Sequence, residues 1–283
     1  MNSSLAQAWQ GEYAVRRLRA QEQTDQQLEP LGRTGLTALA VQPGEWVLDV
    51  GCGAGATVLE LARAAAPGGG VCGVDVSEQM LERARERCAA QRLQNVQLLA
   101  ADAASCDFER HFDALYSRFG VMFFDDPAAA FANLRRSVVP GGRLAFVCWQ
   151  ALAQNPWAAQ PLAALRAAVP EARLPEMFEP GRPGPFYFGD PERARQPLRA
   201  AGWTDIELTP HRMPIHIGGC MSLESAVGYS MEVGPPGRFV VAAGERRADD
   251  CRQALTRVLA PFTTQRGTWM EAAVFVITAV SRP

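Results

Sequence analysis

Three glycines on one short loop are the residues of this chain best placed to hold a ligand. They lie in the run Val47-Leu-Asp-Val-Gly-Cys-Gly-Ala-Gly55. The apolar residues 46–50 predict a buried strand that ends at Gly51, and residues 56–66 predict a helix. Because glycine has no Cβ, a ligand can approach the backbone of this loop closely. Free N–H groups at the start of the following helix favour an anionic group there.

Three aspartates each stand at or just after the end of a predicted strand. Asp49 lies two residues before the first glycine, where its carboxylate can pair with the ammonium of a methionine moiety. Asp75 ends the next predicted strand and is placed to bind ribose hydroxyls. Asp102 follows the third predicted strand and can accept a hydrogen bond from an adenine amino group. The three acids together predict a nucleoside ligand that carries an ammonium group.

The glycine spacing by itself leaves a dinucleotide open as the ligand. Gly51-x-Gly53-x-x-Ala56 fits the dinucleotide fingerprint, and enzymes that bind NAD share an acid at the place of Asp75. Asp49 argues against this alternative, because a carboxylate there would repel a pyrophosphate. Lysine is absent, since all 28 basic residues are arginine. An NAD(P)-dependent oxidoreductase with a Tyr-x-x-x-Lys set is therefore disfavoured.

Composition excludes several other classes of protein. The 283 residues carry a formal net charge of -2, which argues against a nucleic-acid partner. There is no run of ~18 apolar residues and no basic-then-apolar leader, so we expect a cytoplasmic protein with no membrane partner. The seven cysteines are widely spaced and include no C-x-x-C pair. This pattern predicts reduced thiols and no metal site.

The elements that must position these residues alternate between strand and helix from residue 45 to residue 149. This alternation predicts an α/β fold around a parallel sheet. Ser77 is the expected N-cap of a helix over 78–91, with its hydroxyl accepting from a backbone N–H. Asp126, which precedes a proline, is the expected N-cap of another helix. Later strands are predicted at 204–209 and 272–280.

In order and spacing, residues 47–55, 73–80, 99–103 and 112–124 resemble the successive motifs of class I, Rossmann-like S-adenosylmethionine-dependent methyltransferases. Residues 117–127 and 143–149 resemble the ubiquinone-biosynthesis-type and natural-product branch of that family. The resemblance implies a three-layer sandwich whose seven-stranded, mostly parallel sheet has an antiparallel last strand. It also implies methyl transfer to a small-molecule acceptor through O, N or C, with S-adenosylhomocysteine as product, in bacterial secondary or cofactor metabolism.

Carried over by position, the resemblance implies a cofactor site at the ends of four strands. Met80 would pack on the adenine or the ribose, and Ser117 and Arg118 would lie near the transferred methyl. Cys52 would serve as a small side chain between the glycines. The implied cofactor residues are Asp49, Gly51, Cys52, Gly53, Asp75, Val76, Met80, Asp102, Ala103, Ser117 and Arg118.

The acceptor site is expected under helices and loops outside the sheet. Residues 1–40 predict a helical cover, and a methyltransferase domain over 41–283 would carry insertions at about 150–190 and 211–270. The Pro- and Gly-rich residues 170–190 predict a lid loop. Helices are predicted over 223–233 and 246–260, with Gly234-Pro-Pro-Gly237 between them. Candidate acceptor contacts are Trp9, Tyr13, Arg33, Phe123, Trp149, Trp157, Tyr187 and Tyr229.

Catalysis by such a protein asks little of its side chains. A sulfonium methyl is already electrophilic, so the enzyme needs to align the acceptor and exclude water. A general base is needed only where the nucleophile is protonated at neutral pH. His211 and His216 are the candidates for that base, and a surface or structural role is the competing interpretation of each. A protein of the same fold that binds the cofactor without methyl transfer, such as a cyclase-like enzyme or a binding module, is the other alternative. The expected state is a monomer or homodimer.

Overall fold

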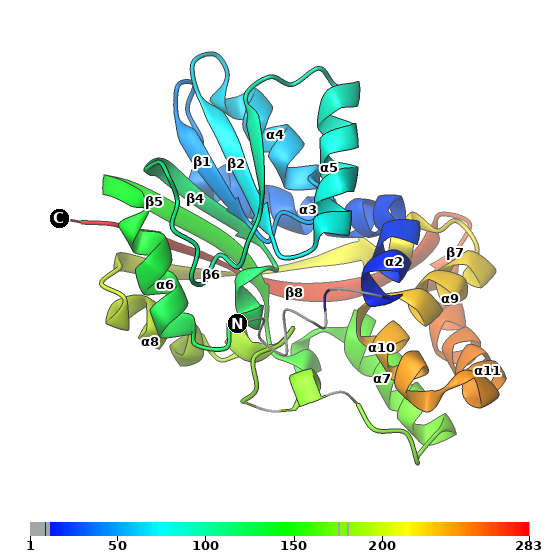
Figure 1. The fold of residues 1–283 in the computed structure, drawn as a ribbon. Coiled ribbons are helices and arrows are strands. Elements are labelled where there is room, and N and C mark those ends of the chain that lie inside the picture. The colour runs from blue at the N-terminus through cyan, green and yellow to red at the C-terminus, as the bar shows by residue number, and fades with distance from the viewer. Residues whose placement is uncertain (1–8, 10–11, 175, 180, 283) are drawn as a thin grey trace.

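The computed structural model describes residue 9 and residues 12–174, 176–179 and 181–282. Its centre is one sheet in which β1, β2, β3, β4 and β5 pair in parallel, while β8 runs antiparallel to both β5 and β6 (Figure 1). This arrangement confirms the predicted α/β fold with an antiparallel last strand. In spatial order the strands are β3 (Val96–Ala100), β2 (Gly70–Asp75), β1 (Trp46–Val50), β4 (Phe112–Arg118), β5 (Val138–Trp149), β8 (Gly267–Val280) and β6 (Thr204–His216), and the short β7 (Thr263–Thr264) pairs with β8.

Helices cover both faces of the sheet, so the molecule has three layers (Figure 1). Side chains alternate between the faces along each strand. The fully buried neighbours Leu115 and Tyr116 of β4 accordingly belong to two different apolar cores. One face is covered by α3 (Gln21–Leu39), α4 (Ala56–Ala65) and α5 (Glu78–Ala90), and the other by α6 (Pro127–Arg136) and α8 (Pro191–Ala200).

Helix α3 packs unusually close to the sheet because two of its buried residues are glycines. A Cβ at Gly35 would lie 2.6 Å from Val147 Cγ2, and one at Gly32 would lie 2.7 Å from Arg118 Cδ. The Tyr116 hydroxyl donates to the Gly32 carbonyl oxygen at 2.8 Å. This contact sets the height of α3 above β4, and therefore the position of its N-terminal half beside the ends of the strands.

Four further helices from two separate stretches of the chain pack on one another. Helix α7 follows β5, whereas α9, α10 and α11 lie between β6 and β7. We call these four the helical cluster; they are α7 (Pro156–Ala168), α9 (Leu223–Glu232), α10 (Gly234–Ala243) and α11 (Ala248–Leu259). A short helix, α2 (Glu12–Arg19), precedes α3 and contacts α5. No helix in the described residues has both the length and the apolar character needed to cross a bilayer.

Single turns of 3-10 helix complete the chain. They are η1 (Val121–Phe123), η2 (Leu152–Gln154), η3 (Glu176–Phe178), η4 (Tyr187–Gly189), η5 (Ile217–Gly219), η6 (Glu245–Arg247) and η7 (Ala260–Phe262). Two of them lie in the Pro- and Gly-rich stretch 170–190, which is otherwise irregular as expected.

Local expectations about the helix starts fare differently. Asp126 is confirmed as an N-cap, because its Oδ1 accepts from Ala129 N at 3.0 Å. Ser77 stands at the N-cap position of α5, but its hydroxyl makes no capping hydrogen bond; instead its backbone N–H donates to Asp75. The prediction that residues 234–237 separate two helices as a non-helical segment is wrong, since Gly234 begins α10. Proline needs no hydrogen-bond partner in the first turn, so the two prolines are tolerated there.

The last two long strands extend beyond their expected ends. Strand β6 continues past residue 209 to His216, and β8 begins at Gly267 rather than at residue 272. The two strands pair from Thr204 opposite Val280 to His216 opposite Trp269, and the added length begins at Pro210 opposite Phe275. Pairing between strands far apart in sequence supplies the hydrogen bonds, which the local pattern of side chains does not reveal.

Candidate functional site

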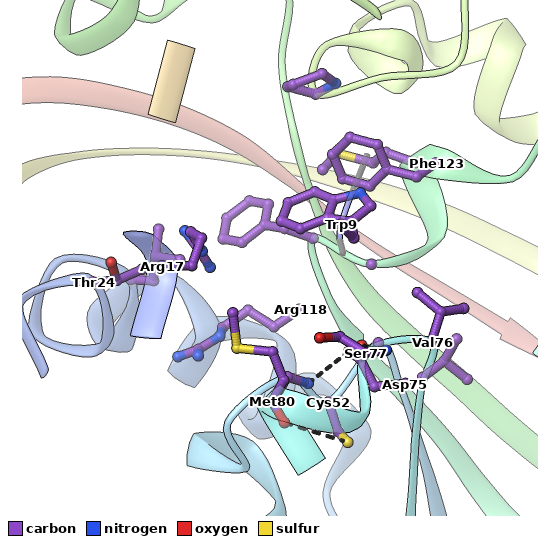
Figure 2. Close-up of a pocket in the computed structure, with 18 of the residues that line it drawn as sticks. Trp9, Arg17, Thr24, Cys52, Asp75, Val76, Ser77, Met80, Arg118 and Phe123 are labelled. Atoms are coloured by element: carbon purple, nitrogen blue, oxygen red, sulfur yellow. Dashed lines mark hydrogen bonds between the residues drawn. The ribbon is translucent and has the colours of Figure 1, made fainter. Parts of the chain in front are cut away.

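A cavity of about 520 Å³ opens at the carboxyl ends of the parallel strands. It lies beside the junction of β1 with β4, on whose two sides the strand order runs in opposite directions, the usual ligand site of such sheets. The loops after β1, β2 and β3 form one side, which we call the glycine-loop half. The other side is rich in aromatic rings and is called the aromatic half. Figure 2 shows Trp9 and Phe123 on the one side and Cys52, Asp75 and Met80 on the other.

The glycine loop after β1 needs its glycines for two different reasons. Gly51, Gly53 and Gly55 all have positive φ, at 69°, 53° and 80°, where other L-residues are strained. At Gly51 a Cβ would also lie 2.9 Å from Gly120 Cα in the loop after β4. At Gly53 a Cβ would meet no protein atom within 4 Å, although this residue lines the cavity. Gly53 therefore leaves space where a ligand can lie against the backbone.

Asp75 joins the first two loops of the glycine-loop half. Its Oδ2 accepts from Gly53 N at 2.8 Å, and its Oδ1 accepts from Ser77 N at 2.9 Å (Figure 2). Burial raises the pKa of this carboxyl, an effect that the two N–H donors and the charge of Arg17 partly oppose. Both oxygens keep further lone pairs, so this cavity-lining carboxyl can accept hydroxyl donors from a ligand.

Asp49 and Ser117 lie behind the loops and do not line the cavity. Asp49 is fully buried; its Oδ2 accepts from Thr57 Oγ1 at 2.5 Å, and its Oδ1 has no partner among the described residues. Burial raises the pKa of Asp49 to about 7. The Ser117 hydroxyl donates to the Val50 carbonyl oxygen at 2.7 Å and accepts from Gly120 N at 3.2 Å. Ser117 thus braces the loops after β1 and β4 against each other.

The remaining cofactor candidates all line this one cavity. Asp102 follows β3, and its Oδ1 accepts from Ala104 N at 2.9 Å. Cys52 is buried, and burial raises the pKa of its thiol well above the usual value, so it is a neutral, small side chain. The candidates that line the cavity are Gly51, Cys52, Gly53, Asp75, Val76, Met80, Asp102, Ala103 and Arg118.

Helix α3 contributes a polar face that sequence reasoning missed. Asp25 Oδ2 lies 3.0 Å from Arg87 Nη1, and its Oδ1 lies 3.3 Å from Arg118 Nη2. Arg87 Nη1 also donates to the Ala54 carbonyl oxygen at 2.7 Å, which ties α3 to the glycine loop. The signal was present in the sequence, because polar residues recur at helical spacing ahead of the apolar Leu31. The α3 residues that line the cavity are Gln21, Thr24, Asp25, Gln27 and Leu28.

The aromatic half is built from rings that pack against one another, one pair stacked, one tilted and one edge-on. The ring centres of Phe119 and Trp149 are 4.3 Å apart with planes 13° apart, and those of Trp149 and Trp157 are 4.7 Å apart. Trp9 meets Phe123 edge-on at 4.8 Å. The sequence predicted four of these five rings as acceptor contacts and missed Phe119. It also missed the start of α10, from which Pro235, Pro236 and Arg238 reach the cavity.

Known proteins share both the motifs and the architecture. Residues 47–142 match the family described as a methyltransferase domain. Nocamycin O-methyltransferase of Saccharothrix syringae is 29% identical over 229 residues, which are 77% of this chain and 79% of that protein. Aklanonic acid methyltransferase of Streptomyces sp. (strain C5) is 35% identical over 118 residues, covering 41% of this chain and only 54% of that protein.

A solved structure, the YcgJ protein from Bacillus subtilis, has a TM-score of 0.58 and 18% identity, and covers 90% of this chain and 99% of that chain. At that identity the likeness supports the fold, while the family rests on the sequence matches. The matched domain and these relatives support an S-adenosylmethionine-dependent methyltransferase of class I.

Neither histidine singled out as a base reaches the cavity of this methyltransferase. His211 and His216 both lie in β6, opposite β8, and neither lines the cavity. His216 Nε2 lies 2.9 Å from the Cys220 carbonyl oxygen, and its ring stacks on Trp269 with centres 4.7 Å apart. Because β6 continues through both histidines, they belong to the sheet rather than to an insertion above the site, and the expectation is corrected.

The other acceptor candidates of the methyltransferase divide in the same way. Tyr229 lines the cavity, where its hydroxyl donates to Thr24 Oγ1 at 3.3 Å. Tyr187 does not line it; its ring packs against Phe188. Arg33 is exposed and pairs with Glu29. Of Tyr13, only the backbone in α2 lies within the described part of the structure.

Proposed function

We propose that this methyltransferase binds S-adenosylmethionine across the glycine-loop half and a small-molecule acceptor in the aromatic half. The observation that carries the proposal is the position of Asp75, whose carboxylate lines the cavity while two loop N–H groups hold it in place. Gly53 supports it, because its missing side chain leaves open space beside the same carboxylate.

The residues of the glycine-loop half fit the parts of this cofactor. Asp75 would accept from the ribose hydroxyls, Asp102 and Ala103 would meet the adenine, and Met80 would pack against it. The buried Oδ1 of Asp49, behind the loop, lacks a partner among the described residues, so this carboxyl would favour an ammonium group on the cavity side of the loop. When bound, the cofactor supplies an electrophilic methyl group. The protein's tasks are then to orient the acceptor and to keep water away.

The aromatic half supports an acceptor with flat, apolar surface. Phe119 stacks on Trp149, and Trp157 packs against Trp149 at a tilt of 44°, so the wall is apolar and excludes water. The relatives are named for nocamycin and aklanonic acid, which supports a natural product as the acceptor. Bacterial secondary metabolism is the setting that these names favour.

Calorimetric titration tests the cofactor assignment. S-adenosylmethionine and S-adenosylhomocysteine are expected to bind the wild-type protein, whereas NADH and NADPH give no heat of binding. Asp75→Ala should weaken the binding of S-adenosylhomocysteine roughly 10- to 100-fold, because hydrogen bonds to a charged group contribute about 1.5–3 kcal/mol. Asp107→Ala, which removes an exposed aspartate outside the cavity, is the matched control and should leave the affinity unchanged. Binding of a nicotinamide cofactor instead would overturn the proposal.

A further inference from the structure

We propose that cofactor binding displaces a proton from Asp49, which the free protein keeps as a neutral carboxylic acid up to about neutral pH. The inference rests on the proposed cofactor site and adds a link between that site and pH. Its basis is a buried acid whose charge the protein leaves almost uncompensated, beside a cavity whose ligand carries positive charge.

The surroundings of Asp49 do little to stabilise a negative charge. Its side chain is fully buried behind the glycine loop. The Oδ2 atom accepts from Thr57 Oγ1 of α4 at 2.5 Å, and Oδ1 has no partner among the described residues. A carboxylate here loses its hydration and gains in return one hydrogen bond from a neutral hydroxyl. Burying a charge with so little compensation is unfavourable, so the neutral acid is the favoured form in the free protein.

Charged neighbours change this balance only in part. Arg118 of β4 favours the charged form of Asp49, but its Nη2 already lies 3.3 Å from Asp25 Oδ1. Asp75 of β2 opposes the charged form, because two carboxylates near each other repel. Burial is the largest influence, and it raises the pKa of Asp49 to about 7 against the effects of Thr57 and Arg118. The free protein therefore holds this proton over much of the range below neutral pH.

The remaining titratable groups around Asp49 do not release a proton near neutral pH. Burial raises the pKa of the Cys72 thiol in β2 to about 11, and it raises the pKa of the Cys52 thiol well above its usual value. Burial likewise raises the pKa of the Tyr116 hydroxyl in β4. No histidine is among the described residues that line the cavity. Apart from Asp75, the carboxyls that line it are half-buried or exposed and do not share the burial of Asp49; they are Asp25, Asp102, Asp125 and Asp126.

The cofactor supplies the positive charge that Asp49 lacks. S-adenosylmethionine carries an ammonium group and a sulfonium, and S-adenosylhomocysteine keeps the ammonium group. Gly51, Cys52 and Gly53 line the cavity and follow Asp49 within four residues, so a cation held against this loop faces the buried carboxyl across the loop. An opposite charge nearby favours the ionised form of an acid. The O–H bond of Asp49 then breaks, its electron pair stays on the carboxylate, and the proton passes to the solvent.

Coupling of this kind is reciprocal. If the bound cofactor favours the charged form of Asp49, then the charged form binds the cofactor more tightly by the same factor. Affinity should therefore rise with pH until Asp49 is ionised in the free protein as well, and then level off. For a carboxyl with a pKa of about 7, the dissociation constant should fall about tenfold between about pH 6 and 8.

Calorimetric titration with S-adenosylhomocysteine tests the inference. Each titration is run near neutral pH in two buffers, PIPES and imidazole, which take up a proton with different heats, so the difference between the observed heats counts the protons released. The wild-type protein should release about half a proton more than Asp49→Asn, because about half of the Asp49 carboxyls are protonated there. Comparison with Asp49→Asn, an isosteric and permanently neutral variant, also removes the ligand's own proton exchange. The Kd of Asp49→Asn should stay within about twofold between about pH 6 and 8.

Asp75→Asn is the matched control, because it neutralises the neighbouring acid that lines the same cavity. It should bind more weakly at each pH but keep the roughly tenfold change in Kd. An equal proton count in wild type and Asp49→Asn, or a pH dependence that only Asp75→Asn removes, would each overturn the inference. Failure of S-adenosylhomocysteine to bind at every pH would contradict the proposed cofactor site, on which the inference depends.

A measurement on the free protein separates the two claims. Nuclear magnetic resonance of the aspartate carboxyl carbons should show one carboxyl, missing from Asp49→Asn, that titrates near pH 7 in the wild-type protein. Saturating S-adenosylhomocysteine should move that signal, at about pH 6, to the position of the charged form. Absence of such a carboxyl from the free protein would overturn the inference even where the cofactor binds.

Discussion

The two halves of the cavity are assembled in different ways. Each loop of the glycine-loop half directly follows a strand, so Gly53, Asp75 and Asp102 occupy equivalent places in three successive strand–loop units. The aromatic half draws on residue 9, the loop after β4, the end of β5, the helical cluster and the stretch near residue 180. The glycine-loop half thus repeats one local strand–loop arrangement. The aromatic half forms only when segments distant in the sequence pack together.

Charged residues, by contrast, line both halves. Asp75 and Asp102 face the glycine-loop half, and Asp126 lines the cavity near the aromatic half. Arg17 lies 5.8 Å from the centre of the Trp9 ring, and its charge also opposes the raised pKa of Asp75. Asp25 of α3 pairs with Arg87 and Arg118, so α3 holds the two sides together.

The largest expected effect concerns Asp49 beneath the glycine loop. Its pKa of about 7 exceeds the value of about 3.9 in an unfolded chain, so between those pH values the folded protein holds a proton that the unfolded chain has lost. Stability from this group is therefore present at low pH and is lost as the pH rises toward 7. Relative to Asp49→Asn, the free energy of unfolding of the wild-type protein should fall by on the order of 4 kcal/mol between about pH 4 and 7.

Urea unfolding of both proteins across that range measures the difference. Asp126→Asn, which changes an exposed helix cap near the aromatic half and keeps Asp49, is the control; its free energy of unfolding should fall with pH as that of the wild-type protein does. If the difference in free energy of unfolding between wild type and Asp49→Asn stays constant across this pH range, Asp49 does not behave as a buried acid that differs from the exposed acids near the aromatic half.

An intermediate effect is expected for Asp25 of α3, which lies between the two halves of the cavity. Asp25→Ala leaves Arg87 and Arg118 without their shared partner, so it should lower the free energy of unfolding by roughly 1–3 kcal/mol. The variant should also bind S-adenosylhomocysteine more weakly. Arg87 still donates to the glycine loop, but it has lost the ion pair with Asp25 that connects it to α3. Urea unfolding and calorimetry measure the two changes. Glu29→Ala on the same helix removes only an exposed pair with Arg33 and should leave the free energy of unfolding close to that of the wild-type protein.

The smallest effect is expected at the two histidines of β6. His211→Ala and His216→Ala should leave the affinity for S-adenosylhomocysteine within about twofold of wild type. His216→Ala should destabilise the fold by about 0.5–1.5 kcal/mol through lost stacking on Trp269. A large loss of this affinity would show that the sheet beyond the cavity takes part in binding.

Much of the fold was predictable because it depends on local chemistry. Each predictable feature depends on residues close together in the sequence. These features are the glycines with positive φ, the apolar runs of the strands and the Asp126 cap. The extent of β6 was not predictable, because its pairing with β8 joins residues far apart in the chain, such as Thr209 and Val276, which are 67 positions apart. That extension moved His211 and His216 from the expected insertion into the sheet.

The amino-acid sequence by itself determined the architecture, the glycine loop and the order of the acidic residues, because strand–loop–helix units place such residues by short-range rules. Only the tertiary structure decided that Asp49 lies behind the loop, that α3 closes over it through Asp25, and that Arg238 meets Trp9. These contacts depend on the packing of helices onto a sheet, where burial and charge are set by neighbours remote in sequence. The lining of the aromatic half therefore depends on the packing of the helical cluster and α2, which no sequence motif encodes.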